Sequence, residues 1–129
     1  MRRQFQLPED DVEQLDSLGL EWESLHEPNG QWLLLHGFGL PAGYNHPIGS
    51  VAIQIPGNYL VAGLDMAYFF PHLTRADGQA PRQTEARMHV DGKEWQRWSR
   101  HYTWIPGHHN LATHIVLVRH WLDHAVGKG

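Results

Sequence analysis

The hydrophobic and polar positions along the chain predict one helix near each end. The clearer helix spans residues 110–125, where apolar residues recur at i, i+4, i+7 and i+11 and therefore share one face. The other spans residues 8–18, with Pro8 at its first position, acidic residues in its first turn and Gly19 after it as a stop. The apolar stripes are Leu111, Ile115, Val118 and Leu122 in the longer helix and Val12, Leu15 and Leu18 in the shorter one.

Four strands are predicted between these helices. Residues 21–26 and 31–36 flank Glu27-Pro28-Asn29-Gly30, a turn signal with proline at its second position and glycine at its fourth. Residues 51–55 alternate as a half-buried strand does, and residues 65–70 form an aromatic strand. Residues 37–49 hold four glycines and two prolines, so we expect them to be irregular.

This order of elements predicts an α+β fold. We expect an antiparallel four-stranded sheet with an N-terminal and a C-terminal helix. A chain of 129 residues is long enough to bury a core of its own, which predicts a single domain over residues 1–129.

The composition narrows the class of protein. The chain contains no cysteine, which excludes disulfides, cysteine-ligated zinc and a cysteine nucleophile. No apolar run follows the basic pair Arg2-Arg3, and no apolar stretch approaches the ~20 residues of a membrane span. We therefore expect a soluble cytoplasmic protein with no membrane partner.

The net charge of −4 is unevenly distributed along the chain. Eight acids and no bases lie between Glu9 and Glu27, and six bases lie between Arg75 and Arg100. This split argues against general nucleic-acid binding and favours a protein partner with its own charged surface. Solvated faces of no special function are the alternative interpretation.

Residues 95–101 read W-Q-R-W-S-R-H, and two further motifs follow them. Residues 104–107 read W-I-P-G, and residues 111–114 read L-A-T-H. This spacing resembles the prokaryotic ubiquitin-conjugating-enzyme-like family E, a bacterial branch of the ubiquitin-conjugating (UBC) superfamily, over about residues 7–125. The resemblance implies a UBC-like fold, in a branch whose members typically lack the catalytic cysteine of the superfamily.

The resemblance also implies where an active site lies. Pro56-Gly57-Asn58-Tyr59 fits the superfamily segment Pro-x-x-Tyr-Pro, with Leu60 in place of the second proline. Phe70-Pro71-His72-Leu73 stands where a His-Pro-Asn motif is expected, and the asparagine is missing. The cysteine would follow around residues 77–81, where no side chain is nucleophilic. The nearest hydroxyls are those of Thr74 and Thr84, which become candidates for an acyl acceptor.

Ser99 and His101 are a second candidate pair, because an activated hydroxyl needs an adjacent imidazole. Positions i and i+2 share a face on a strand but not on a helix. Trp95, Trp98 and Tyr102 follow the spacing i, i+3, i+7, which favours a helical turn and separates the pair. In that case the serine hydrogen-bonds loop backbone, whereas His101 stays a candidate acid or base near neutral pH.

The same region supplies candidates for partner binding, because tryptophan and arginine are enriched at interfaces. His108 and His109 precede the last helix, where the resemblance places the rim of the active site. A core position explains Trp95 and Trp98 equally well. The binding candidates are Trp95, Trp98, Arg100, Trp104, His72, His108 and His109.

Eleven histidines raise the alternative of a histidine-rich metal-binding protein. His120 and His124 have the i, i+4 spacing by which two imidazoles share an ion. Trp121 occupies the glutamate position of the H-E-x-x-H motif, and the two histidines project away from the apolar stripe. We therefore expect solvated histidines and no metal site.

The resemblance implies a protein that receives or positions a ubiquitin-like modifier for transfer to an amine. Its partners would be the modifier and an adenylating activating enzyme, in an operon associated with phage defence, and no cofactor is expected. Without a cysteine thioester, a transferase-like activity requires a hydroxyl or an imidazole to carry the acyl group. A noncatalytic UBC-like protein-binding module is the main alternative, and the question of catalysis stays open.

Overall fold

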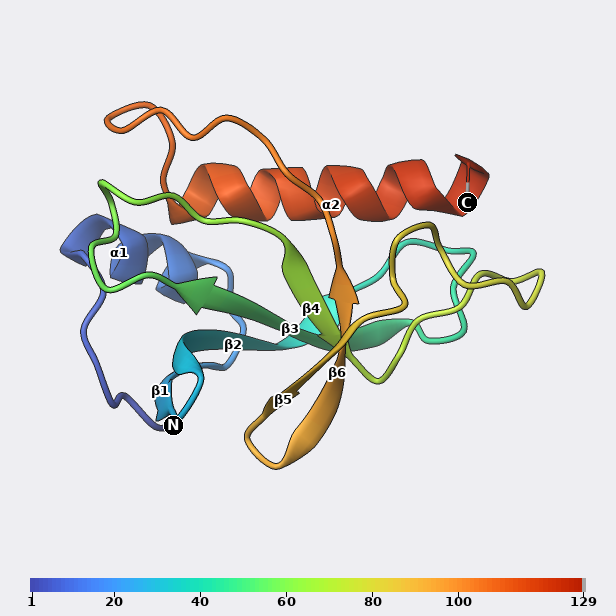
Figure 1. Ribbon diagram of the computed structural model, residues 1–129, viewed down its shortest axis with the longest axis horizontal. Coiled ribbons are helices and arrows are strands. Elements are labelled where there is room, and N and C mark those ends of the chain that lie inside the picture. The colour runs from blue at the N-terminus through green and yellow to red at the C-terminus, as the bar shows by residue number, and fades with distance from the viewer. Residues whose placement is uncertain (129) are drawn as a thin grey trace.

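The computed structural model describes residues 1–128, which form two helices and six antiparallel strands. In Figure 1 the long C-terminal helix lies across a curled sheet, and the shorter helix lies near its N-terminal end. The α+β class is therefore confirmed, whereas the prediction of four strands is wrong. The elements are α1 (Glu9–Ser17), β1 (Trp22–Glu27), β2 (Gly30–Gly39), β3 (Ile48–Ile55), β4 (Ala67–Phe70), β5 (Arg87–Val90), β6 (Lys93–Trp98) and α2 (Leu111–Lys128).

The additional strands β5 and β6 form a hairpin that the sequence interpretation missed. Asp91 and Gly92 connect them, and both have positive φ (53° and 72°), as a tight two-residue hairpin turn requires. The helical turn predicted from the spacing of Trp95, Trp98 and Tyr102 is wrong, because the two tryptophans lie on β6. Residues i and i+3 of a strand point to opposite faces, so the two indoles enter different cores.

The sheet has the strand order β1-β2-β3-β4-β6-β5, and every neighbouring pair is antiparallel. β2 and β3 are longer than predicted, because pairing resumes beyond an irregularity between Leu35 and Phe38. Gly37 lies in this bulge with φ of 68°, a conformation that glycine adopts without strain. The bulge thus places His36 between the regular parts of the ladder.

The sheet packs a separate core on each face. The helix-side core joins α1 and α2 to one face and contains Leu15, Leu33, Val51, Phe69, Trp98, Ile115 and Val118, among others. The open-face core lies on the opposite face, to which neither α1 nor α2 contributes, and contains Leu25, Trp32, Leu34, Ala52, Tyr68, Val90 and Trp95. Alternation along each strand assigns successive residues to the two cores in turn.

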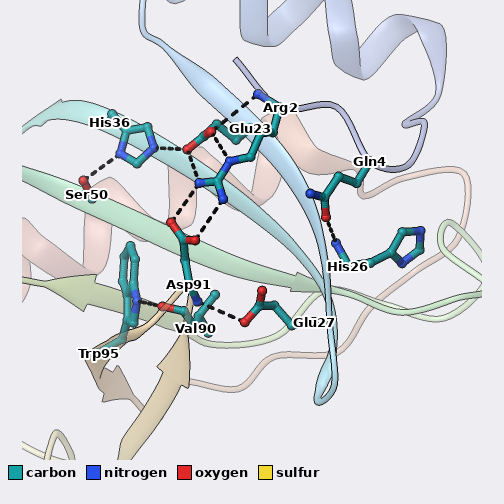
Figure 2. Close-up of polar contacts among 10 residues, drawn as sticks. All are labelled: Arg2, Gln4, Glu23, His26, Glu27, His36, Ser50, Val90, Asp91 and Trp95. Atoms are coloured by element: carbon teal, nitrogen blue, oxygen red, sulfur yellow. Dashed lines mark hydrogen bonds and ion pairs between the residues drawn. The ribbon is translucent and has the colours of Figure 1, made fainter.

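The curl of the sheet brings its first and last strands close together at the open face. Residues 2–4 run along the free edge of β1, where the Gln4 N–H donates to the Ser24 carbonyl at 2.8 Å. The Arg2 guanidinium then contacts Glu23 on β1 and Asp91 in the β5–β6 turn, at 2.8 Å each (Figure 2). The Asp91 N–H also donates to Glu27 Oε1 at 3.0 Å. These contacts close one end of the curl.

Candidate functional site

The loop after β4, residues 71–84, occupies the position where the resemblance expects the active site. Two amide side chains hold its first residues. Gln96 on β6 accepts from the Leu73 N–H and donates to the Leu73 carbonyl, both at 3.0 Å. Asn45 donates to the His72 carbonyl at 3.1 Å and accepts from the Thr74 N–H at 3.0 Å. The backbone of residues 72–74 is thus fixed from two sides, although the loop lacks the asparagine of the superfamily motif.

The two threonines of this loop differ in their surroundings. Thr84 is buried, and its hydroxyl donates to the Pro81 carbonyl at 2.7 Å. Thr74 is half-buried beside the segment that Asn45 holds. Within residues 1–128, neither hydroxyl is hydrogen-bonded to an imidazole. His72 donates from Nε2 to the Glu94 carbonyl at 3.2 Å, so its ring is directed to β6.

Ser99 and Arg100 hold the other end of the loop. The Ser99 N–H donates to the Gln83 carbonyl at 3.0 Å, and Arg100 donates to the Arg82 carbonyl at 3.0 Å. The Ser99 hydroxyl accepts from Arg97 Nε at 3.2 Å. The guanidinium of Arg100 lies 5.0 Å from the Trp98 ring, and burial lowers the pKa of Arg100. Both residues therefore hold the backbone of the loop through hydrogen bonds. Within the described residues, no hydrogen bond joins Ser99 to His101.

His101 pairs instead with Asp65, which lies just before β4. Its Nδ1 is 2.9 Å from one oxygen of the Asp65 carboxylate and 3.0 Å from the other. An ionised carboxylate only accepts hydrogen bonds, so Nδ1 carries the hydrogen and the neutral ring keeps its lone pair on Nε2. The His101 side chain is 66% exposed. This geometry suits an imidazole that exchanges protons with a partner at the surface.

Trp104, His108 and His109 belong to the connection between β6 and α2. The Trp104 indole lies against Gly63, where an added Cβ would be 2.3 Å from its Cγ, and it donates to the Leu60 carbonyl at 2.9 Å. The His109 ring packs 5.5 Å from the Trp104 ring. Its Nδ1 accepts from the Ile105 N–H at 2.9 Å, whereas His108 is exposed. Trp104 and the two histidines thus present a partly open aromatic rim.

His114 lies beneath this rim and is fully buried. Its Nε2 donates to the Met66 carbonyl at 2.8 Å, so Nδ1 accepts from the Tyr102 hydroxyl at 2.7 Å. Burial lowers the pKa of His114 to about 4, so the ring is neutral at pH 7. The L-x-T-H histidine of the motif therefore fixes the β6–α2 connection onto the start of β4.

Tyr59, the tyrosine of the Pro-x-x-Tyr segment, links the two helices. Its hydroxyl donates to Asp11 Oδ2 at 2.7 Å, and the same buried carboxylate accepts from the Leu111 N–H at the start of α2. Burial raises the pKa of Asp11 and that of Tyr59. Asp11 and Tyr59 are positioned to hold the helices together and lie away from open solvent.

Trp95 and Trp98 are buried at 1% and 0% exposure, so neither ring offers surface to a partner. Trp95 donates to the Val90 carbonyl at 2.9 Å in the open-face core. Trp98 donates to Gln96 Oε1 at 3.0 Å in the helix-side core. The core interpretation explains both positions.

His120 and His124 lie exposed on the outer side of α2, with ring centroids 6.5 Å apart. Among residues 1–128, no three histidine, cysteine, aspartate or glutamate side chains are grouped so that they could hold a metal ion. In the same part of the chain, neither helix is long and apolar enough to cross a membrane.

The α+β fold and the W-x-x-W-S-R-H segment, in a chain without cysteine, are features that the resemblance to a UBC-like protein predicts. The chain belongs to the prokaryotic E2 family E, whose family model matches residues 7–125. No match was found among curated proteins or among solved structures. The family assignment confirms the resemblance stated from the motifs.

Three residues of this region were missed by sequence reasoning: Asn45, Asp65 and Gln96. Asn45 falls in a stretch expected to be irregular, and Gln96 stands between two tryptophans that were assigned to a helical turn. A strand interpretation of residues 93–98 would have singled out Gln96 as a polar residue on a buried face. No local pattern pairs Asp65 with His101, because their contact depends on the pairing of β4 with β6.

Proposed function

We propose that this protein binds a ubiquitin-like modifier and an adenylating activating enzyme and positions the modifier's C-terminal acyl group for transfer to an amine. This chain itself forms no cysteine thioester in the transfer, since it has no cysteine. Membership of the prokaryotic E2 family E supports the general role. A place in a phage-defence system is part of the same proposal.

The observation that carries the proposal is the fixed conformation of residues 72–74. Gln96 and Asn45 hold these residues through four hydrogen bonds between side-chain amides and backbone groups, of 3.0 to 3.1 Å. An extended acyl terminus is transferred efficiently only where it is held in a defined orientation. A rigid loop at the position of the superfamily's active site supports such an orienting role.

The connection between β6 and α2 is the surface that we assign to the partners. Arg100 at its start contacts the far end of the loop, at Arg82, and His101, Trp104, His108 and His109 follow toward the N-terminus of α2. A partly open aromatic surface with cationic neighbours suits a protein partner with acidic groups. His101 is the residue of this surface that could take the proton of an incoming amine, because Asp65 holds Nδ1 and leaves Nε2 free to accept.

The noncatalytic binding module is the second candidate function. It is favoured by the engagement of Thr84 and Ser99, whose hydroxyl groups hydrogen-bond Pro81 and Arg97 rather than a base. In this alternative the protein holds modifier and activating enzyme together and forms no covalent bond.

Reconstitution with an adenylating enzyme and a ubiquitin-like protein from the same gene neighbourhood tests the proposal. With ATP, the conjugating role predicts an adduct that survives thiol reductant and is cleaved by hydroxylamine, as an oxyester is. His101→Asn should slow discharge of this adduct to an amine about 100-fold if the imidazole takes the proton. Binding of both partners without any adduct would favour the module, and absence of binding to either partner would refute the proposed function.

A further inference from the structure

Three side chains from neighbouring strands form a continuous hydrogen-bonded line on the open face of the sheet. Ser50 Oγ on β3 is 2.9 Å from His36 Nδ1, and His36 Nε2 is 2.8 Å from Glu23 Oε2 on β1. Figure 2 shows Ser50, His36 and Glu23 in this order, with Arg2 beyond the carboxylate. Among the serines and threonines of residues 1–128, Ser50 alone has its hydroxyl hydrogen-bonded to an imidazole.

The direction of each hydrogen bond in this line follows from the chemistry of its groups. Arg2 donates to Glu23 at 2.8 and 3.2 Å and lowers the pKa of that carboxyl to about 2, so Glu23 is ionised and only accepts. His36 Nε2 therefore carries the hydrogen. In the neutral ring Nδ1 then has the lone pair, and the Ser50 hydroxyl donates to it. A hydroxyl that donates to an imidazole oriented by a carboxylate is the arrangement of an activated serine.

The Glu23 carboxylate is itself held in place beside His36. The Arg2 guanidinium lies between two carboxylates, those of Glu23 and Asp91, at 2.8 Å from each. Asp91 thus holds Arg2, and Arg2 in turn orients the Glu23 carboxylate, which is 2.8 Å from His36 Nε2.

The line also lies beside the segment that replaces the superfamily's active-site motif. Ser50 pairs directly with Phe70, the last residue of β4, and Pro71-His72 follow at once. Neither α1 nor α2 contributes to the core on this face of the sheet, Ser50 is half-buried, and the His36 side chain is 29% exposed. A surface hollow lined by Leu20, Glu21, His36 and Gly37 adjoins the imidazole. The imidazole therefore borders solvent, and the half-buried Ser50 hydroxyl lies 2.9 Å from its Nδ1.

We propose that Ser50 is the acyl acceptor of this cysteine-less protein, with His36 as its base and Glu23 as the positioning residue. The inference rests on the proposed function, names the residue that carries the modifier and assigns the proton transfers to His36 in place of His101. His101 lies beside Asp65, which precedes β4, whereas Ser50 pairs with Phe70 at the opposite end of that strand. The donor is a thioester of the modifier's C-terminal carboxyl group. Ser50 Oγ bonds to the thioester carbonyl carbon while the carbon–sulfur bond breaks. The Ser50 proton passes to His36 Nδ1 and then to the leaving thiolate. The product is an oxyester on Ser50 and a free thiol on the donor. An amine nitrogen then bonds to the oxyester carbonyl carbon while the bond from that carbon to Ser50 Oγ breaks. The amine proton passes through His36 to Ser50 Oγ, which restores the serine hydroxyl.

A fluorophosphonate probe, which reacts with activated serine hydroxyls, tests the site without any partner protein. Mass spectrometry should find one label on the wild-type protein, at Ser50. Ser50→Ala should abolish it, and His36→Asn should slow it at least about 100-fold, the range expected for a general base. Ser17→Ala is the matched control, because Ser17 is an exposed serine on α1 whose hydroxyl bonds backbone only. Absence of a label at Ser50, or a rate unchanged in His36→Asn, would overturn the proposal.

The absence of cysteine allows a second measurement that does not depend on the probe. Ser50→Cys and Ser17→Cys each introduce the single thiol of the protein. A thiol beside an imidazole is ionised more readily, so Ser50→Cys should react with iodoacetamide at pH 7 at least 10-fold faster than Ser17→Cys, although it is less exposed. His36→Asn in the Ser50→Cys background should remove this advantage. Equal rates for the two thiols would overturn the proposal, and melting temperatures by circular dichroism verify that each variant is folded.

The reconstituted system separates this inference from the proposed function. Loss of the hydroxylamine-sensitive adduct in Ser50→Ala, with conversion to a reductant-sensitive adduct in Ser50→Cys, supports Ser50 as the acceptor. Adduct formation by Ser50→Ala at the wild-type rate overturns it. A wild-type protein that is labelled at Ser50 by the fluorophosphonate but forms no adduct with the modifier keeps an activated serine and refutes the conjugating role instead.

Discussion

The buried imidazole of His114 makes the stability of this protein depend on pH in a defined direction. Burial lowers its pKa from 6.5 to about 4, because the charged form would lose its hydration inside the helix-side core. Between these two values the unfolded chain binds a proton that the folded protein excludes. The free energy of unfolding therefore falls as the pH decreases from 6.5 toward 4, and the full contribution is present above pH 6.5.

The size of this effect follows from the same two values. Each unit of difference in proton affinity corresponds to about 1.4 kcal/mol, so a decrease to pH 5, which is 1.5 units below 6.5, costs about 2 kcal/mol. Glu23 does not enter this window, because its pKa is about 2 and its ordinary value is 4.5. The raised pKa of Asp11 changes the free energy of unfolding in the opposite direction, but it does so equally in the wild-type protein and in a variant that differs only at His114.

Urea denaturation at pH 7 and pH 5 measures the effect. The variant His114→Gln keeps a donor and an acceptor for Met66 and Tyr102 but does not titrate. When the pH is lowered from 7 to 5, the free energy of unfolding of this variant should decrease by about 2 kcal/mol less than that of the wild-type protein. His89→Gln, at a histidine whose side chain is 77% exposed, should behave as the wild type does. Equal losses in the wild-type protein and His114→Gln would refute the assignment of a neutral, buried His114.

Two further predictions concern packing. Gly63→Ala should displace the Trp104 indole, because the new Cβ would lie 2.3 Å from its Cγ, whereas the Cβ of the control variant Gly57→Ala would meet no atom within 4 Å. The indole N–H signal of Trp104 in NMR spectra should therefore shift in Gly63→Ala and not in Gly57→Ala. An unshifted signal in Gly63→Ala would contradict the packing of Trp104 on Gly63. Trp98→Ala should lower the free energy of unfolding by roughly 3–5 kcal/mol in urea denaturation, since a fully buried indole leaves a large cavity; a loss below 1 kcal/mol would contradict its core position.

The elements with a clear period were predictable from the sequence. The apolar stripe of α2 follows the helical spacing over about three turns, and the Pro28-Asn29-Gly30 turn separates two apolar runs, so both were assigned correctly. The hairpin β5–β6 was not, because tryptophans at positions 95 and 98 fit a helical stripe as well as they fit two faces of a strand. The Asp91-Gly92 dipeptide was the available signal for a hairpin at this point.

The candidate site could be predicted only in part, because its contacts depend on register. The motif predicted a site at the loop after β4, where Gln96 and Asn45 hold the backbone of Leu73 and Thr74. No local pattern connects Glu23, His36 and Ser50, which are 13 and 14 residues apart along the chain. Antiparallel pairing brings their strands together, and the bulge after Leu35 turns His36 between its two partners. Such a constellation requires the pairing of β1, β2 and β3 to be known.

The loss of the cysteine changes what the fold has to provide. A thiol ionises close to neutral pH, whereas a serine hydroxyl needs a base in hydrogen-bond contact to become a nucleophile. The loop after β4 does not supply such a base for Thr84, whose hydroxyl is committed to the Pro81 carbonyl. The sheet beside it does, because β1, β2 and β3 present a carboxylate, an imidazole and a hydroxyl at successive positions of one face. In our proposal, the task that one thiolate performs in the superfamily is distributed over side chains of three strands, and the fixed geometry of the sheet replaces the intrinsic reactivity of the thiol.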